Sequence, residues 1–152
     1  MTDGQDRCSA KTEGYGGGMG NFVMWADGSC APNPGTGAYG LVVREDGALL
    51  FQTSRRLPGT HTNNTAEWHG AIAALEFAAE RDYCASVELR MDSNLVVNQL
   101  AGRWKVKNHG LLPLVQKGRS LLDSLRARGV TVTVRWVPRE ENAEADALSG
   151  ER

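Results

Sequence analysis

Four acidic side chains, far apart along the chain, each stand beside a segment with its own secondary-structure pattern. They are Asp27 after FVMWA, Glu67 within NNTAEWHGAIAAL, Asp92 after VELRM and Asp146 within EENAEADAL. Carboxylates gathered from distant segments onto one sheet edge are typical of a site for hard divalent cations, because such ions prefer oxygen ligands. Two cations held close together support in-line displacement at phosphorus. The four acids therefore predict metal-dependent chemistry on a phosphate ester.

Each acid also has an ordinary structural explanation. Asp27 before a glycine suits a turn that ends a strand, and Glu67 stands three residues after Asn64, which is the spacing of a capping box. Asp92 is placed to cap a short helix, and Asp146 suits a solvated helix position. These alternatives stay open for any one acid taken alone.

The residues around the acids favour a binding site. Asp27 is followed by GSCAPNPGTGAYG, whose glycines let the backbone approach a ligand closely and whose Asn33 offers a donor and an acceptor. Thr62, Asn63 and Asn64 precede Glu67, and small polar groups of this kind suit sugar edges and phosphate oxygens.

Composition indicates one domain without a marked charge bias. With 152 residues and 41% hydrophobic residues the chain can bury a single core. The formal net charge is −1, so a nucleic-acid ligand would require a local patch of Lys and Arg. The odd number of cysteines, Cys8, Cys30 and Cys84, and the lack of CxxC spacing argue against a disulfide framework or a zinc site.

The first twenty residues differ from the rest. Residues 1–20 end in GYGGGMG and carry almost no aliphatic side chains, so we interpret them as a flexible leader before a domain at 21–152. No apolar run reaches the ~18 residues that a membrane span requires, and the start lacks a signal-peptide core. We therefore expect a soluble, cytoplasmic protein with reduced thiols.

The elements that must position the acids begin with three strands. The segments FVMWAD, AYGLVVR and ALLFQTSRR, at 22–27, 38–44 and 48–56, are rich in residues that suit a pleated sheet. Asp46-Gly47 is a hairpin turn signal between the second and third segments. The pattern predicts an antiparallel meander.

Helices and strands then alternate. We predict helices over 64–81, 93–100 and 111–128, strands over 86–92 and 131–137, and a final helix that carries Asp146. The order β-β-β-α-β-α-α-β-α predicts an α/β fold with a mixed five-stranded sheet. In such sheets ligands bind beyond the carboxyl ends of strands, where the pattern places Asp27 and Asp92. Trp25, Trp68 and Trp136 fall on apolar stripes and are predicted to lie in the core.

Four ordered motifs resemble those of type 1 ribonuclease H. They are ADGSCAPNPGTGAYG, HTNNTAEWHGAIAALE, MDSNLVVNQL and WVPREENAEADAL, and the resemblance covers about residues 22–149. It implies the ribonuclease H-like fold, with helices on both faces of the sheet. It also implies hydrolysis of the RNA strand of RNA/DNA hybrids, leaving 5′-phosphate and 3′-hydroxyl ends.

By this resemblance Asp27, Glu67, Asp92 and Asp146 are the catalytic metal ligands. Two Mg²⁺ ions would bind when substrate is present, and Mn²⁺ would substitute for them. One ion would activate water and the other would stabilise the leaving 3′-oxygen. We expect Asp27 to be the shared ligand, with Glu67 and Asp92 on one ion and Asp146 on the other.

The resemblance also implies substrate contacts that do not read sequence. It places six residues in the minor groove of the hybrid: Gly28, Cys30, Asn33, Asn63, Asn64 and Asn94. Thr62 would hold a DNA phosphate with help from Asn108. A basic stretch, Arg103, Trp104, Lys105 and Lys107, would contact the DNA strand. The alternatives are helix capping by the asparagine pair and an exposed loop of solvated charges.

The chain departs from the family pattern in two places. The longer basic protrusion is missing between WKVKN and the next helix, so we expect weaker hybrid binding with a marked salt dependence. The loop before Asp146 is shortened to VPREEN and has no His. Whether Arg139, Glu140 or Glu141 replaces that His stays open, because acids at a helix start also suit the helix dipole.

We expect a monomer that binds an RNA/DNA hybrid and no membrane. Two other functions fit part of the pattern. One is a different nuclease of the same fold, such as a 3′-5′ exonuclease, which the NPG loop and the TNN-x-x-E arrangement disfavour. The other is a noncatalytic hybrid-binding module, in which the loss of an acid would be expected, although all four are present.

Overall fold

The computed structural model describes residues 20–150, which form one mixed sheet with strand order β3-β2-β1-β4-β5. The strands are β1 Gly20–Ala31, β2 Thr36–Glu45, β3 Ala48–Arg56, β4 Cys84–Met91 and β5 Thr131–Trp136. The helices are α2 Asn63–Ala79, α3 Asn94–Leu100, α4 Leu112–Ala127 and α5 Ala143–Ser149, and a 3-10 turn covers Arg139–Asn142. The predicted element order is confirmed. Gly20 belongs to β1, and the rest of the predicted leader lies outside the described residues.

The first three strands form the predicted antiparallel meander. β1 pairs with β2 and β2 with β3, both antiparallel. Asp46 and Gly47 close the second hairpin with positive φ values of 52° and 83°, as a tight turn of this kind requires. β4 and β5 then add parallel to β1 and to each other, so the carboxyl ends of β1, β4 and β5 face the same edge of the sheet.

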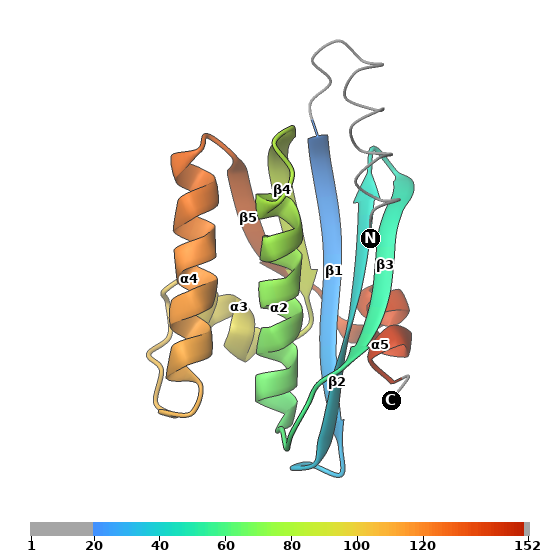
Figure 1. Cartoon of the computed structure of the whole chain (residues 1–152), viewed down its shortest axis with the longest axis vertical. Coiled ribbons are helices and arrows are strands. Elements are labelled where there is room, and N and C mark those ends of the chain that lie inside the picture. Colours follow the sequence, from blue (N-terminus) through green and yellow to red (C-terminus); the bar gives the residue numbers. More distant parts are fainter. Residues whose placement is uncertain (1–19, 151–152) are drawn as a thin grey trace.

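Helices cover both faces of the sheet, as predicted. α2 and α4 pack side by side on one face, whereas α5 lies on the other face against β1 and β2 (Figure 1). α5 packs closely on its face at Gly40, where an added Cβ would come closer than 3.0 Å to the backbone of Ala145. No helix within residues 20–150 is long and apolar enough to cross a membrane.

The core lies between the sheet and α2, α3 and α4. Trp68 is fully buried there with Phe22, Met24, Leu75 and Leu89. The indole nitrogen of Trp68 donates a hydrogen bond to Gln99 Oε1 at 3.0 Å, which satisfies the polar atom that its burial removes from water.

The prediction that Trp25 and Trp136 lie in the core is wrong for Trp136, and Trp25 is only half-buried. Trp136 is 44% exposed, because it is the last residue of an edge strand and has a neighbouring strand on one side only. Its indole nitrogen donates to the backbone oxygen of Asp92 at 3.2 Å. Trp25 is half-buried, and the guanidinium of Arg90 lies 5.1 Å from its ring centroid. Both side chains lie outside the core proper.

Candidate active site

Three of the four predicted acids come together at one edge of the sheet. One carboxylate oxygen from each of Asp27, Glu67 and Asp92 lies within 4.8 Å of the other two. The three residues come from β1, from the first half of α2 and from the position directly after β4. A spacing of this kind lets a single cation contact all three carboxylates.

Asp27 does not end its strand, contrary to the sequence prediction. β1 continues to Ala31 because its second half pairs with β2, with Asp27 opposite Gly40. The parallel ladder between β1 and β4, however, ends at Trp25 and Arg90. Asp27 therefore lies just beyond the carboxyl end of the parallel pair, which is where a ligand site is expected in such a sheet.

Glu67 is not part of the cap of its helix. The N-cap of α2 is Thr62, whose hydroxyl accepts from the backbone nitrogen of Thr65 at 3.2 Å, while the Thr65 hydroxyl accepts from the Thr62 nitrogen at 2.9 Å. This pair completes a capping box without Asn64 or Glu67. The capping alternative for Glu67 is therefore wrong, because the short threonine side chain already takes that position.

Gly28 brings α2 against β1 at the height of the site. A Cβ at Gly28 would come closer than 3.0 Å to the backbone of Ala66 and Glu67. Only a residue without a side chain lets the helix backbone lie this close to the strand. Asp27 directly precedes Gly28, so this contact holds Glu67 close to Asp27.

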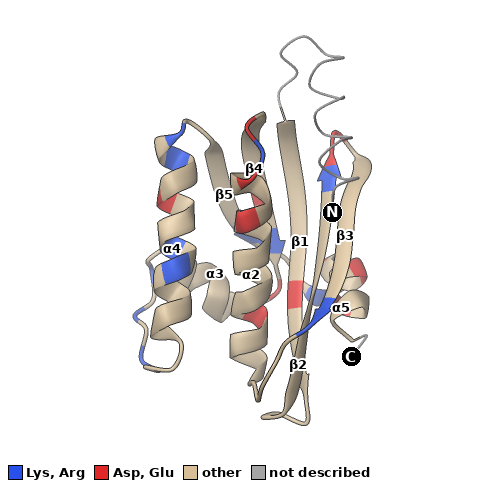
Figure 2. Ribbon diagram, in the orientation of Figure 1, with Lys and Arg blue, Asp and Glu red and all other residues tan. Residues whose placement is uncertain are grey.

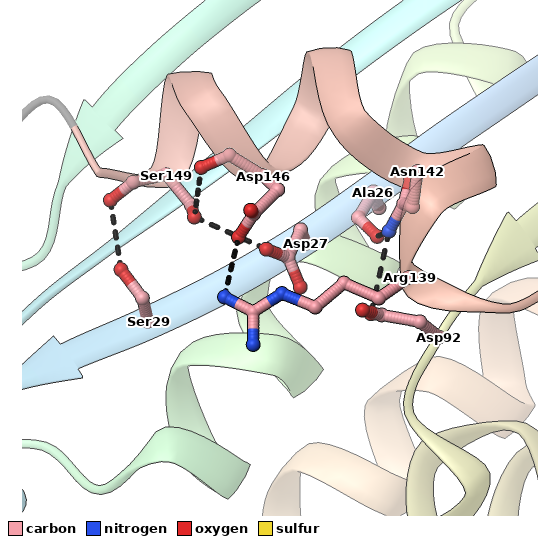
Figure 3. A network of polar contacts seen from close by, with 8 residues as sticks. All are labelled: Ala26, Asp27, Ser29, Asp92, Arg139, Asn142, Asp146 and Ser149. Atoms are coloured by element: carbon pink, nitrogen blue, oxygen red, sulfur yellow. Dashed lines mark hydrogen bonds and ion pairs between the residues drawn. The ribbon is translucent and has the colours of Figure 1, made fainter.

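Asp146 lies next to Asp27 and is outside the group of three. Its carboxyl shares a hydrogen bond with the carboxyl of Asp27, and its Oδ1 lies 3.3 Å from Arg139 Nη2 (Figure 3). Asp27 thus lies next to Asp146 as well as Asp92. This central position is the one a ligand shared between two ions would occupy.

Burial and mutual repulsion raise the pKa of two of the acids. The pKa of Asp27 rises to about 8, first because burial removes water from the carboxylate and then through the hydrogen bond with Asp146 and the charges of Asp92 and Glu67. Burial, with the charge of Asp92, raises the pKa of Glu67 to about 7, against the opposing effects of Ser93 and Arg139. Without a cation, protons therefore bind to these carboxylates near neutral pH. A bound cation would compensate the negative charge in their place.

The raised pKa of Asp27 predicts a loss of stability as the pH rises. Because the pKa is about 8 in the folded chain and 3.8 for an ordinary aspartate, the contribution of this carboxyl to stability is fully present below about pH 4. This contribution is lost as the pH rises through about 8. In chelator, the free energy of unfolding of the parent, relative to that of Asp27→Asn, should decrease by a few kcal/mol from about pH 6 to about pH 9.

Thermal and urea unfolding at both pH values measure this difference. Added Mg²⁺ should raise the melting temperature of the parent more at about pH 9 than at about pH 6, because fewer protons compete for the carboxylates. Asp27→Asn is the control in which this pH-dependent gain shrinks. An equal gain from Mg²⁺ at both pH values in the parent would contradict the assignment.

Two buried side chains beside the acids were not predicted. Asn142 is 1% exposed and its amide donates to the backbone oxygen of Ala26 at 3.0 Å and to Asp92 Oδ1 at 3.4 Å. Ser149 is fully buried and donates to Asp27 Oδ2 at 3.2 Å. They stand four residues before and three residues after Asp146 on the same chain segment. This helical spacing is the signal that could have identified them.

Four of the predicted minor-groove residues lie at or against the start of α2: Cys30, Asn33, Asn63 and Asn64. Asn33 Oδ1 accepts from the backbone nitrogen of Asn63 at 3.2 Å, which brings the loop after β1 onto the helix N-terminus. The Cys30 thiol donates to the backbone oxygen of His61 at 2.9 Å and is buried, so its side chain holds this loop together. Asn94 is exposed as the first residue of α3.

The predicted DNA-strand residues line a cavity of about 550 Å³ next to α2. Its lining includes Asn64, Trp104, Lys105 and Asn108, together with Arg103 and Lys107. Trp104 is 47% exposed, and Lys and Arg residues lie along the segment before α4 (Figure 2). The predicted partnership of Thr62 with Asn108 has no visible contact: Thr62 caps α2, and Asn108 Oδ1 accepts from Gly110 at 2.8 Å.

The short loop before α5 places one basic residue at the site. Arg139 contacts Asp146, as described, whereas Glu140 and Glu141 are exposed within the 3-10 turn. The loop before α5 thus places a permanent cation in contact with the carboxylate of Asp146.

Comparisons with known proteins agree with this geometry. A family model described as reverse transcriptase-like matches residues 26–151. A bifunctional protein of Mycobacterium tuberculosis is 39% identical over 130 residues, which are 85% of this chain and 34% of that protein. Ribonuclease HI of Halobacterium salinarum is 38% identical over 133 residues, covering 87% of this chain and 64% of the relative. The chain thus spans about a third to two thirds of these relatives.

Other relatives are matched over most of their length. A ribonuclease H of a Jannaschia species is 32% identical over 147 residues, which are 90% of that protein. Among solved structures, the N-terminal RNase H domain of the M. tuberculosis protein Rv2228c superposes with a TM-score of 0.77 at 36% identity, over 87% of this chain and 92% of that one. LC11 RNase H1 in complex with an RNA/DNA hybrid gives 0.74 at 33% identity, over 86% and 95%.

The family model covers nearly the whole described chain, the fold matches, and three of the four acids that the family resemblance singled out meet at one edge of the sheet. The chain belongs to the type 1 ribonuclease H family of nucleases.

Proposed function

We propose that the chain is a divalent-metal-dependent endonuclease that hydrolyses the RNA strand of RNA/DNA hybrids and leaves 5′-phosphate and 3′-hydroxyl ends. The observation that carries the proposal is the cluster of Asp27, Glu67 and Asp92, with the carboxyl of Asp146 hydrogen-bonded to that of Asp27. The solved hybrid complex of LC11 RNase H1, at 33% identity, supports the substrate class. We propose a monomer, because all four acids come from one chain.

The donor set fits hard divalent cations. All the candidate ligand atoms are carboxylate oxygens, and burial together with the neighbouring acids raises the pKa values of Asp27 and Glu67, a cost of ionisation that a bound cation would offset. Asp27, Glu67 and Asp92 would hold one Mg²⁺, and Asp27 with Asp146 would hold a second. When bound, the ions would supply a nucleophile at neutral pH and compensate charge on the leaving oxygen.

Other residues of the chain would position the acids and bind the hybrid. Asn142 orients Asp92, and the contact between Gly28 and α2 fixes the distance from Asp27 to Glu67. Arg139 is exposed beside Asp146 and would attract the phosphate backbone to the acidic site. The start of α2 and the cavity lined by Trp104 and Lys105 would take the two strands of the hybrid.

A digestion panel tests the proposal. Internally labelled RNA/DNA hybrid, duplex RNA, duplex DNA and single strands are incubated with Mg²⁺, Mn²⁺ or chelator. We expect internal cleavage of the RNA strand of the hybrid with either metal and none with chelator. Cleavage only from a free end would favour an exonuclease, and tight hybrid binding without cleavage in any metal would indicate a binding module.

Replacing Asn63 with Ala should weaken the selection of RNA over DNA. The residue is exposed at the first position of α2, and the cap of that helix is made by Thr62 and Thr65, so stability should change little. Loss of one hydrogen bond to a 2′-hydroxyl should reduce the preference for hybrid over duplex DNA by about five- to tenfold.

Competition binding in chelator, with hybrid and duplex DNA of one sequence, measures this preference. Thr65→Ala is the matched control: it removes the capping box and should lower stability while the preference persists. If Asn63→Ala changes stability but leaves the preference intact, the residue has a structural role only.

A further inference from the structure

The helix that carries Asp146 is short and is attached to the sheet through serine hydroxyls. α5 has seven residues, and the last carbonyls of any helix have no partner within it. Ser29 of β1 donates to the backbone oxygen of Ser149 at 2.9 Å, and Ser54 of β3 donates to that of Leu148 at 2.6 Å. The sheet thus holds the end of α5 through the backbone carbonyls of Leu148 and Ser149.

The backbone of α5 also packs directly on the sheet. Gly40 leaves space for the carbonyl of Ala145 and the side chain of Leu148, and Ala145 itself is fully buried. These contacts fix where the helix lies. They do not fix how the carboxylate of Asp27, which comes from β1, is oriented toward the carboxylate of Asp146.

Ser149 links the two acids. Its hydroxyl lies 2.8 Å from the backbone oxygen of Asp146 and 3.2 Å from Asp27 Oδ2 (Figure 3). The residue is fully buried, so water cannot replace this donor. The hydroxyl has a single hydrogen, which lies between these two acceptors, so it links the residue that bears one candidate ligand to the carboxylate of the other.

We infer that Ser149 is a positioning residue that orients Asp27 Oδ2 toward the ion shared with Asp146. The inference rests on the proposed function for the presence of that ion. A carboxylate that binds a cation presents only part of its lone pairs to it, and a neutral donor on the remaining side fixes its rotation without adding charge. Loss of such a supporting hydrogen bond costs about 10- to 100-fold in metal affinity.

The test compares Ser149→Ala with Ser54→Ala. Each variant removes one serine hydroxyl that anchors α5, but only the hydroxyl of Ser149 contacts a carboxylate. Mn²⁺ affinity is measured by calorimetry on the full chain without nucleic acid, and stability is measured by urea unfolding. Ser149→Ala should bind Mn²⁺ about tenfold more weakly. Ser54→Ala should lose stability and keep the parent affinity.

A second readout separates positioning from structure. The Mg²⁺ concentration for half-maximal cleavage of hybrid should rise about tenfold in Ser149→Ala, while the rate at saturating Mg²⁺ stays within about twofold of the parent. If Ser149→Ala does not fold, Ser149→Cys keeps the volume with a weak donor and should show an intermediate loss of affinity. Parent Mn²⁺ affinity in either folded variant overturns the inference. Mn²⁺ binding by the parent without hybrid cleavage would instead overturn the proposed function.

Discussion

Replacing Asp92 with Asn is expected to reduce hydrolysis of the hybrid by about a thousandfold or more, while hybrid affinity changes by less than about twofold. The carboxylate is one of the three that lie within 4.8 Å of one another. An amide of the same shape keeps the packing beside Asn142 but removes one ligand charge, which costs several kcal/mol of charge stabilisation. The groove contacts that would bind the hybrid come from other residues.

Single-turnover cleavage at saturating Mg²⁺ and hybrid binding in chelator measure the two quantities separately. Glu140→Gln is the matched control, because it makes the same chemical change at an exposed position of the neighbouring loop. That control should cleave at nearly the parent rate. Turnover by Asp92→Asn within about threefold of the parent would remove Asp92 from the site.

Replacing Gly28 with Ala is expected to have the largest effect on folding of any single methyl group added near the site. The new Cβ would come closer than 3.0 Å to backbone atoms of Ala66 and Glu67. Backbone cannot move aside as a side chain can, so α2 must shift away from β1. We expect a loss of at least about 2 kcal/mol in the free energy of unfolding.

The same shift should separate Glu67 from Asp27 and weaken Mn²⁺ binding by the folded fraction. Urea unfolding and calorimetry measure the two effects. Gly150→Ala is the control, since its Cβ would meet no atom closer than 3.5 Å. A Gly28→Ala variant with parent stability and parent Mn²⁺ affinity would show that this close contact does not set the distance between the acids.

The element order could be predicted from local patterns, but the placement of individual side chains could not. The period of apolar residues and the Asp46-Gly47 turn are local signals, and the hairpin and helices formed where they indicated. The continuation of β1 beyond Asp27 depends on pairing with β2. The exposure of Trp136 depends on β5 being an edge strand. Neither feature can be predicted from the residues near those positions, because both depend on pairing with distant segments.

The site shows the same division. Residue type and position pointed to Asp27, Glu67, Asp92 and Asp146, the family resemblance implied that they bind metal, and the structure brings the first three together. The residues that support them, Asn142 and Ser149, carry neutral side chains common in any helix. Their role follows from burial and from contacts made across more than a hundred residues of chain in two cases, from Asn142 to Ala26 and from Ser149 to Asp27.

Anomalous diffraction from crystals grown with Mn²⁺ tests the central claim most directly, because it locates the ion without reference to activity. We predict an anomalous peak bonded to carboxylate oxygens of Asp27, Glu67 and Asp92 at about 2.0 to 2.3 Å. In a complex of Asp92→Asn with hybrid, we predict a second peak between Asp27 and Asp146. Crystals that hold Mn²⁺ only elsewhere on the protein, while the same preparation cleaves hybrid, would contradict the account.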